Sequence, residues 1–184
     1  MRPLLVIEDI RPAKRIDLFT VGGVRIQATH YAWISLPAWM LLGLLMALFS
    51  ENGILSFEAL QIGLLYGLCL YLSNVIHSLG HIVAGKIIRS PMNILLLTST
   101  RDVTEYAEGQ ASSPNHKRLL RSLGGPVFNI AAGLAGLAAM VLFGSQPAKI
   151  FALVNFGVGL WTLCPVPSMD GWVIWKALIR PGRR

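Results

Sequence analysis

Four long apolar stretches constrain what this chain of 184 residues can fold into. They run through residues 31–49, 60–82, 123–143 and 150–175. A helix needs about 20 apolar residues to cross the hydrocarbon layer of a membrane, and each stretch is about that long. Four buried core helices of this kind would leave a soluble protein with too little polar sequence to cover its surface. We therefore expect an all-α polytopic membrane protein with about four transmembrane helices.

The positively charged residues are distributed unevenly between the connections. All 16 Lys and Arg residues except Lys149 fall before the first stretch, between the second and third, or near the end of the chain. By the positive-inside rule, both termini and the middle loop are expected on the cytoplasmic side. The net charge of +7 forms no basic stripe interleaved with aromatic residues. The expected partners are therefore membrane lipid and membrane proteins, and not nucleic acid.

A single membrane domain is expected over residues 1–184. Residues 1–30 would form a cytoplasmic N-terminal segment, residues 31–178 the membrane core and residues 179–184 a basic tail. Gly22-Gly23 separates two β-prone runs within residues 18–29, which predicts a β-hairpin. Together with a further β-like piece at residues 91–100, this hairpin would form a small membrane-associated β element beside the helices.

Two histidines lie one helical turn apart in the second apolar stretch, at His77 and His81. Residues at this spacing share a helix face, so both imidazoles can bind one metal ion such as Zn²⁺. A packed, hydrogen-bonded pair of histidines is the alternative for this pattern taken alone. The apolar setting favours a functional site, because ionisable groups at membrane depth are costly.

Asp170 is the only acidic residue in any of the four apolar stretches. It lies shortly before Lys176, as the histidines lie shortly before Lys86, so the predicted topology places all three side chains at a similar depth. Pro165 and Pro167 are expected to end the helix before Asp170. Two histidines and a carboxylate form a ligand set typical of catalytic zinc. A structural acid paired with Lys176 or with a backbone donor is the alternative.

Four segments of the sequence resemble those of the site-2 proteases, which are intramembrane zinc metalloproteases. "IHSLGHIVAG" (76–85) is similar to their H-E-x-x-H helix, and "LGGPVFN" (123–129) is similar to their small-Gly-Pro-x-x-Asn segment. "CPVPSMDG" (164–171) resembles their Asp-Gly motif, and "VGGVRIQATHYAWISL" (21–36) resembles the strand that leads into their first helix.

The resemblance implies that His77, His81 and Asp170 bind zinc and that Asn129 is a candidate for holding an extended substrate. In that family the substrate is itself a transmembrane segment, cut within the membrane near the cytoplasmic face. The β-prone segments would then form a platform to which the substrate adds as a strand. Haem is excluded as a cofactor, because ligands one turn apart on one helix cannot lie on opposite faces of a porphyrin.

Ser78 departs from the family pattern, because it stands where the glutamate of H-E-x-x-H acts as general base. A serine hydroxyl is neutral and a poor proton acceptor, and loss of a positioned base typically costs about 10²- to 10⁴-fold in rate. Asp102, Glu105 and Glu108 are the candidates for a substitute base. The sequence therefore predicts a site-2-protease-like metalloprotease with impaired catalysis. The alternative is a non-catalytic pseudoprotease that binds membrane partners as a regulator or scaffold.

Overall fold

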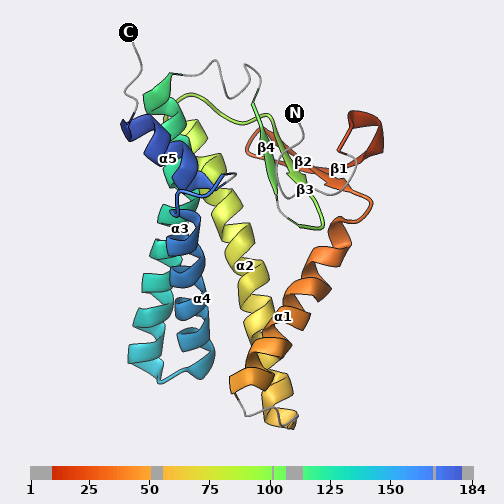
Figure 1. Cartoon of the computed structure of the whole chain (residues 1–184), viewed down its shortest axis with the longest axis vertical. Coiled ribbons are helices and arrows are strands. Elements are labelled where there is room, and N and C mark those ends of the chain that lie inside the picture. The colour runs from red at the N-terminus through yellow and green to blue at the C-terminus, as the bar shows by residue number, and fades with distance from the viewer. Residues whose placement is uncertain (1–9, 51–55, 101, 107–113, 168, 180–184) are drawn as a thin grey trace.

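The computed structural model describes residues 10–50, 56–100, 102–106, 114–167 and 169–179, and the chain is mainly helical with a small sheet (Figure 1). Five α-helices follow the chain in this order: α1 (Ser35–Ser50), α2 (Phe57–Ile87), α3 (Asn115–Phe143), α4 (Gln146–Thr162) and α5 (Asp170–Ile179). The strands are β1 (Arg15–Val21), β2 (Val24–Thr29), β3 (Ile94–Leu97) and β4 (Val103–Glu105), and short 3-10 turns cover Pro12–Lys14 and Ala32–Ile34.

The sheet confirms the predicted β element and extends it to four strands in the order β1-β2-β3-β4. Gly22 and Gly23 both have positive φ, as a two-residue hairpin turn requires, and they join β1 to β2 in antiparallel pairing. β3 pairs parallel to β2 and antiparallel to β4. The parallel pairing needs a long crossover, and here α1 and α2 form it. The sheet is therefore tied to both of these helices.

Two of the described helices, α2 and α3, are long and apolar enough to cross a membrane. Only 28% and 22% of their most apolar segments are buried inside the protein, whereas the core helix of a soluble protein would be mostly buried. α1 and α4 have 16 and 17 residues, fewer than the roughly 20 that a straight crossing needs. The prediction of a membrane-type helical fold is thus supported by two helices, and four crossings stay a prediction.

The fourth apolar stretch forms two helices, with an irregular segment between them. α4 ends at Thr162 and α5 begins at Asp170, with Pro165 and Pro167 in the connection. The helix break predicted from these prolines is confirmed. Gly171 follows Asp170 directly, and a Cβ atom there would collide with the backbone carbonyls of Leu163 and Cys164. The glycine therefore allows the chain to fold back closely.

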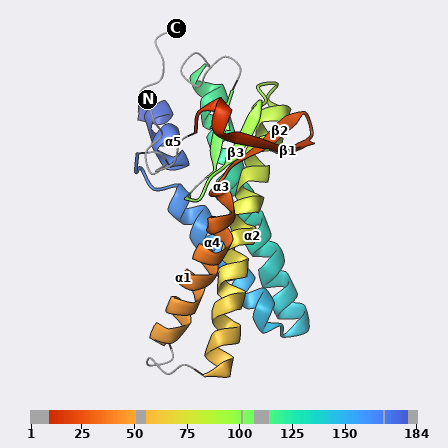
Figure 2. The same cartoon turned by 90° about the vertical axis from the view of Figure 1, so that its right-hand side faces the viewer.

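Two glycines let α2 and α3 pack with their backbones in contact. A Cβ atom on Gly80 would collide with the carbonyl of Gly124, and a Cβ atom on Gly124 would collide with the carbonyl of Gly80. Small residues at such crossings are typical of helices that pack in lipid. Figures 1 and 2 show the sheet and α5 at one end of the bundle, where α2 ends and α3 begins. This end holds the histidines of α2.

We expect the two ends of α3 to lie on opposite sides of the membrane. The helix has 29 residues, which gives a length of about 43 Å at 1.5 Å per residue. His116 lies near its start, and Lys149 follows its end on α4; both are exposed. In a variant without native cysteines, His116→Cys and Lys149→Cys should react with an impermeant thiol reagent from opposite sides of sealed vesicles. Labelling of both from the same side would contradict a crossing by α3.

Candidate metal centre

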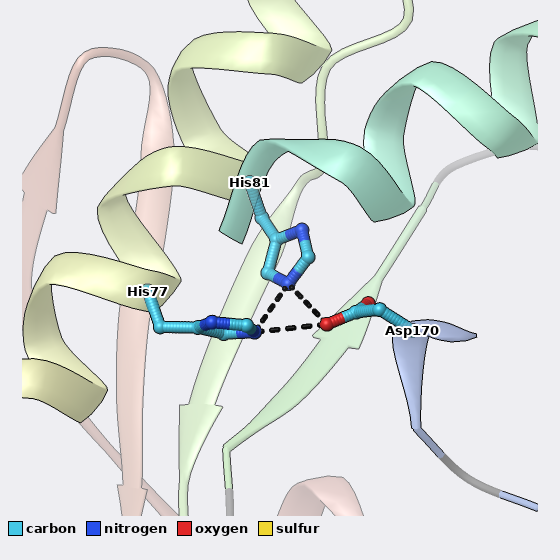
Figure 3. A group of neighbouring side chains, drawn as sticks. All are labelled: His77, His81 and Asp170. Carbon is cyan, nitrogen blue, oxygen red and sulfur yellow. Dashed lines mark hydrogen bonds and ion pairs between the residues drawn. The ribbon is translucent and has the colours of Figure 1, made fainter. Parts of the chain in front are cut away.

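Three side chains converge from two helices far apart in the sequence (Figure 3). His77 and His81 project from α2, and Asp170 is the first residue of α5. Asp170 Oδ2 lies 2.9 Å from His77 Nε2 and 3.4 Å from His81 Nε2, and the two Nε2 atoms are 3.1 Å apart. The structure therefore brings together the three residues that the sequence predicted as ligands.

The ring of His77 is held by α3. Its Nδ1 lies 2.7 Å from Asn129 Oδ1. The amide nitrogen of Asn129 lies 3.0 Å from the carbonyl oxygen of Ser73, which can only accept a hydrogen bond. This contact establishes which end of the amide faces His77, so His77 Nδ1 must carry the proton and donate it. In the neutral imidazole its Nε2 then has a lone pair pointing at the candidate site.

His81 is oriented in the same way by the backbone of α3. Its Nδ1 lies 2.8 Å from the carbonyl oxygen of Arg121, and this oxygen is likewise an acceptor only. His81 Nδ1 must therefore be the donor, and in the neutral imidazole Nε2 is then the acceptor. Metal-binding histidines commonly donate their second N–H to a carbonyl or amide oxygen in this manner.

The result is a cluster of three possible ligand atoms. In their neutral forms both imidazoles offer an Nε2 lone pair to this cluster, and the two ring nitrogens and the carboxylate oxygen lie 2.9–3.4 Å from one another. Two ligand atoms at about 2.0–2.1 Å from a tetrahedral zinc ion would lie roughly 3.3 Å apart. The donor set and its spacing therefore fit zinc. Among the described His, Cys and acidic residues, one group could hold an ion, and it consists of His77, His81 and Asp170.

A buried network of amides supports the site from behind. Asn129 is fully buried, and its amide nitrogen also lies within 2.7 Å of Ser73 Oγ and 3.0 Å of Asn155 Oδ1. Asn155 in turn donates to the carbonyl of Phe151 on α4. Ser73 and Asn155 were not predicted from the sequence, although a polar residue within an apolar stretch is a signal for such a site. A substrate-holding role for Asn129 stays a prediction.

Ser78 lies beside the three-residue cluster and contacts a carboxylate from the sheet. The side chain is buried, and its Oγ donates a hydrogen bond of 2.5 Å to Asp102 Oδ2. Asp102 directly precedes β4. Of the three substitute bases that the sequence suggested, Glu105 forms a two-pronged ion pair with Arg15 at 2.7 and 2.9 Å, and Glu108 lies outside the described residues.

Arg121 supplies more than its backbone carbonyl. Its guanidinium lies 3.8 Å from the centre of the Tyr106 ring, just after β4. Burial raises the pKa of Tyr106, although the charge of Arg121 opposes this, so the phenol stays neutral. This contact links the start of α3 to the sheet. It thereby helps to hold the sheet against the end of the bundle that carries the site.

A cavity of about 410 Å³ lies between the sheet and the helices α1 and α2. Most of its wall is apolar or aromatic, with Ile16 and Leu18 from β1, Trp33 from the 3-10 turn before α1, and Trp39 from α1. The helix α2 also lines the cavity, through Tyr71, Asn74 and Val75 in the turns before His77. Among the described lining residues Asp102 carries the one carboxylate. Asp102 connects the cavity to the candidate metal centre, because it contacts Ser78, the neighbour of His77.

We expect Asn129→Ala to weaken metal binding. The change removes the acceptor for His77 Nδ1, and loss of such a partner typically costs about 10- to 100-fold in metal affinity. Asn155→Ala is the matched control, because it removes a neighbouring amide of the same network that does not contact His77. Zinc affinity measured by competition with a chelator should fall for the first variant much more than for the second. Equal affinities would show that the amide does not orient His77.

A second prediction concerns the glycine against which His77 packs. A Cβ atom on Gly125 would overlap the imidazole ring of His77. Gly125→Ala should therefore displace the ring and lower the zinc content of the purified protein. Gly157→Ala is the control, because a Cβ atom at Gly157 meets nothing within 4 Å. The packing argument fails if both variants keep the same zinc content as the unaltered protein.

Comparison with known proteins gives one informative result. No protein family model matches the sequence, and no curated protein matches it. Among solved structures, the chain is similar to the site-2 protease from Methanocaldococcus jannaschii, with a TM-score of 0.61 and 22% sequence identity. The match covers 91% of this chain and 72% of that chain. The likeness predicted from the sequence motifs is thus confirmed in three dimensions: this chain has the fold of a site-2 protease.

Proposed function

We propose that this chain is an integral membrane metallopeptidase that binds zinc through His77, His81 and Asp170 and cleaves transmembrane segments of other proteins. One observation carries the proposal. The Nδ1 atoms of both histidines donate to oxygens of α3, so both Nε2 atoms are turned toward Asp170 Oδ2. In the neutral imidazoles each Nε2 offers a lone pair, and the three atoms together form a zinc ligand set.

A zinc ion held there would act as a Lewis acid toward a peptide carbonyl and make water nucleophilic at neutral pH. The chain's own residues prepare the site for this chemistry. Asn129 and the carbonyl of Arg121 keep both Nε2 atoms available and fix the ring orientations. The side chains of His77, His81 and Asp170 are 14%, 10% and 19% exposed, so none of the three is completely enclosed.

The proposed substrate is an apolar segment in extended conformation. The cavity beside the site has apolar walls from β1 and α1, which suit the side chains of a transmembrane segment. β1 is an edge strand, and its Leu18 and Phe19 are 47% and 59% exposed. An extended peptide can add to such an edge through backbone hydrogen bonds. This supports the strand platform expected from the sequence.

The proposed topology places both termini and the sheet on the cytoplasmic side. Lys86 and Lys117 lie at the sheet end of α2 and α3, whereas Lys149 follows the opposite end of α3. The excess of positive charge at the sheet end supports a cytoplasmic location by the positive-inside rule. Cleavage would then take place near the cytoplasmic face of the membrane.

A second candidate function is favoured by Ser78, which offers no carboxylate from the ligand helix itself. In this case the chain is a pseudoprotease that keeps the fold and the metal and binds transmembrane partners without cutting them. Ser78→Glu discriminates between the two functions. If catalysis is absent for want of a base, this variant should gain cleavage of about 10²-fold or more. Cleavage by the unaltered protein contradicts the pseudoprotease.

The metal assignment is tested by elemental analysis of the purified protein. We expect about one zinc ion per chain, and much less in His77→Ala, His81→Ala and Asp170→Asn. His116→Ala is the matched control, since His116 is an exposed histidine at the start of α3, outside the site. Zinc content that stays unchanged in His81→Ala would exclude the proposed site, and iron in place of zinc would exclude the proposed metal.

A further inference from the structure

We propose that Asp102 is the general base of this site and that Ser78 is the residue that positions it. This inference rests on the proposed metallopeptidase function and explains how such an enzyme can work without the helix glutamate. In this proposal the carboxylate comes from the sheet, 24 residues further along the chain than the serine. The helix contributes a short hydroxyl side chain that holds the carboxylate in place.

The contact between the two side chains has the geometry of a strong hydrogen bond. Ser78 Oγ and Asp102 Oδ2 are 2.5 Å apart, the range of O–H···O⁻ bonds to an ionised carboxylate. Ser78 is the neighbour of His77 and is buried. The two oxygens of a carboxylate together offer about four lone-pair sites, so the hydrogen bond from Ser78 uses only part of the acceptor capacity of Asp102. Asp102 can therefore accept a proton while Ser78 holds it.

The size of the side chain at position 78 matters for this arrangement. A glutamate on α2 would itself extend toward the site, whereas serine ends after one carbon and leaves space beside the helix. The structure fills this space with the carboxylate of Asp102. β4 begins at the next residue and pairs with β3, with Val103 opposite Leu96. The aspartate is thus supported by a hydrogen-bonded strand, not by an isolated loop.

Asp102 also has access to both substrate and metal site. It lines the apolar cavity in which we place the substrate. Its hydrogen-bond partner Ser78 directly follows His77 on α2. Glu105 is not equivalent, because both its oxygens are paired with Arg15. Asp102 is therefore the described acid that lies between the cavity and the three-residue cluster.

The proposed step conserves atoms and charge. A water oxygen forms a bond to the carbonyl carbon of the scissile peptide while the carboxylate of Asp102 accepts one proton from that water. The carbon–nitrogen bond then breaks, and Asp102 returns the proton to the leaving nitrogen. The products are a carboxylic acid and an amine, and no co-reactant besides water is consumed. Ser78 keeps its own proton throughout and acts only through Asp102.

Cleavage of a transmembrane substrate by the purified zinc-loaded protein tests the roles of the two residues. Asp102→Asn should lower kcat by about 10²- to 10⁴-fold with little change in KM, as expected for loss of a general base. Ser78→Ala should lower kcat less, and Ser78→Thr should retain most of the activity because it keeps the hydroxyl. The double variant Ser78→Ala/Asp102→Asn should be no slower than Asp102→Asn alone. Glu58→Gln is the control for loss of a charge, since Glu58 is exposed in the first turn of α2.

A swapped variant separates a missing base from a damaged fold. Ser78→Glu/Asp102→Asn places a carboxylate back on the helix and should recover at least part of the activity that Asp102→Asn loses. Two further measurements do not depend on cleavage. Asp102→Asn should still hold about one zinc ion per chain. It should bind a peptide hydroxamate roughly 10-fold or more weakly, because the N–OH group of this probe loses its charged acceptor.

The outcomes distinguish this inference from the proposed function. Cleavage by Asp102→Asn at the rate of the unaltered protein overturns the role of Asp102 and leaves the metallopeptidase intact. A zinc-bound protein that is inactive until Ser78→Glu is introduced also overturns that role, and it supports the pseudoprotease. Absence of zinc from the unaltered protein overturns the proposed function and this inference with it.

Discussion

The close contact between α2 and α3 is the constraint on which the rest of the site depends. Gly80 and Gly124 let the backbones of α2 and α3 touch. This close packing brings His77 and His81 of α2 against α3. At a larger separation, neither the amide of Asn129 nor the carbonyl of Arg121 could reach a ring nitrogen. The glycines therefore affect the metal site indirectly. They set the separation of α2 and α3, and this separation allows oxygens of α3 to accept the Nδ1 proton of each histidine.

Buried polar groups in an apolar bundle are costly unless each one has a partner. The polar network behind His77 meets this condition, because the side-chain amides are hydrogen-bonded to one another. Asn155 is anchored to the carbonyl of Phe151, Asn129 contacts Asn155 and Ser73, and His77 donates to Asn129. Each link has a direction that follows from a backbone acceptor. The bundle thus orients a ligand without placing a second charge in its interior.

The contact between Ser78 and Asp102 places a carboxylate beside α2, although the residue that follows His77 carries none itself. In an H-E-x-x-H helix, one segment supplies both the ligands and the base. Here His77 and His81 are on α2, Asp170 is on α5, and the carboxylate that contacts Ser78 belongs to Asp102, the residue before β4. This division ties the site to the sheet, because any movement of β4 relative to α2 would also move the carboxylate. The cavity between the sheet and the helices α1 and α2 is where we place the substrate.

The sequence alone was sufficient for features that depend on neighbouring residues. Helical spacing placed His77 and His81 on one face, Gly22-Gly23 specified the hairpin turn, and the two prolines ended α4 before Asp170, because each effect acts within a few residues. The length of the apolar stretches predicted the helical membrane-type fold but not how many helices cross. Only the tertiary structure decided that β3 pairs parallel to β2 and that Asp102, and not Glu105, meets Ser78. Those contacts join segments separated by tens of residues, and no local preference encodes which of several nearby acids will face the helix.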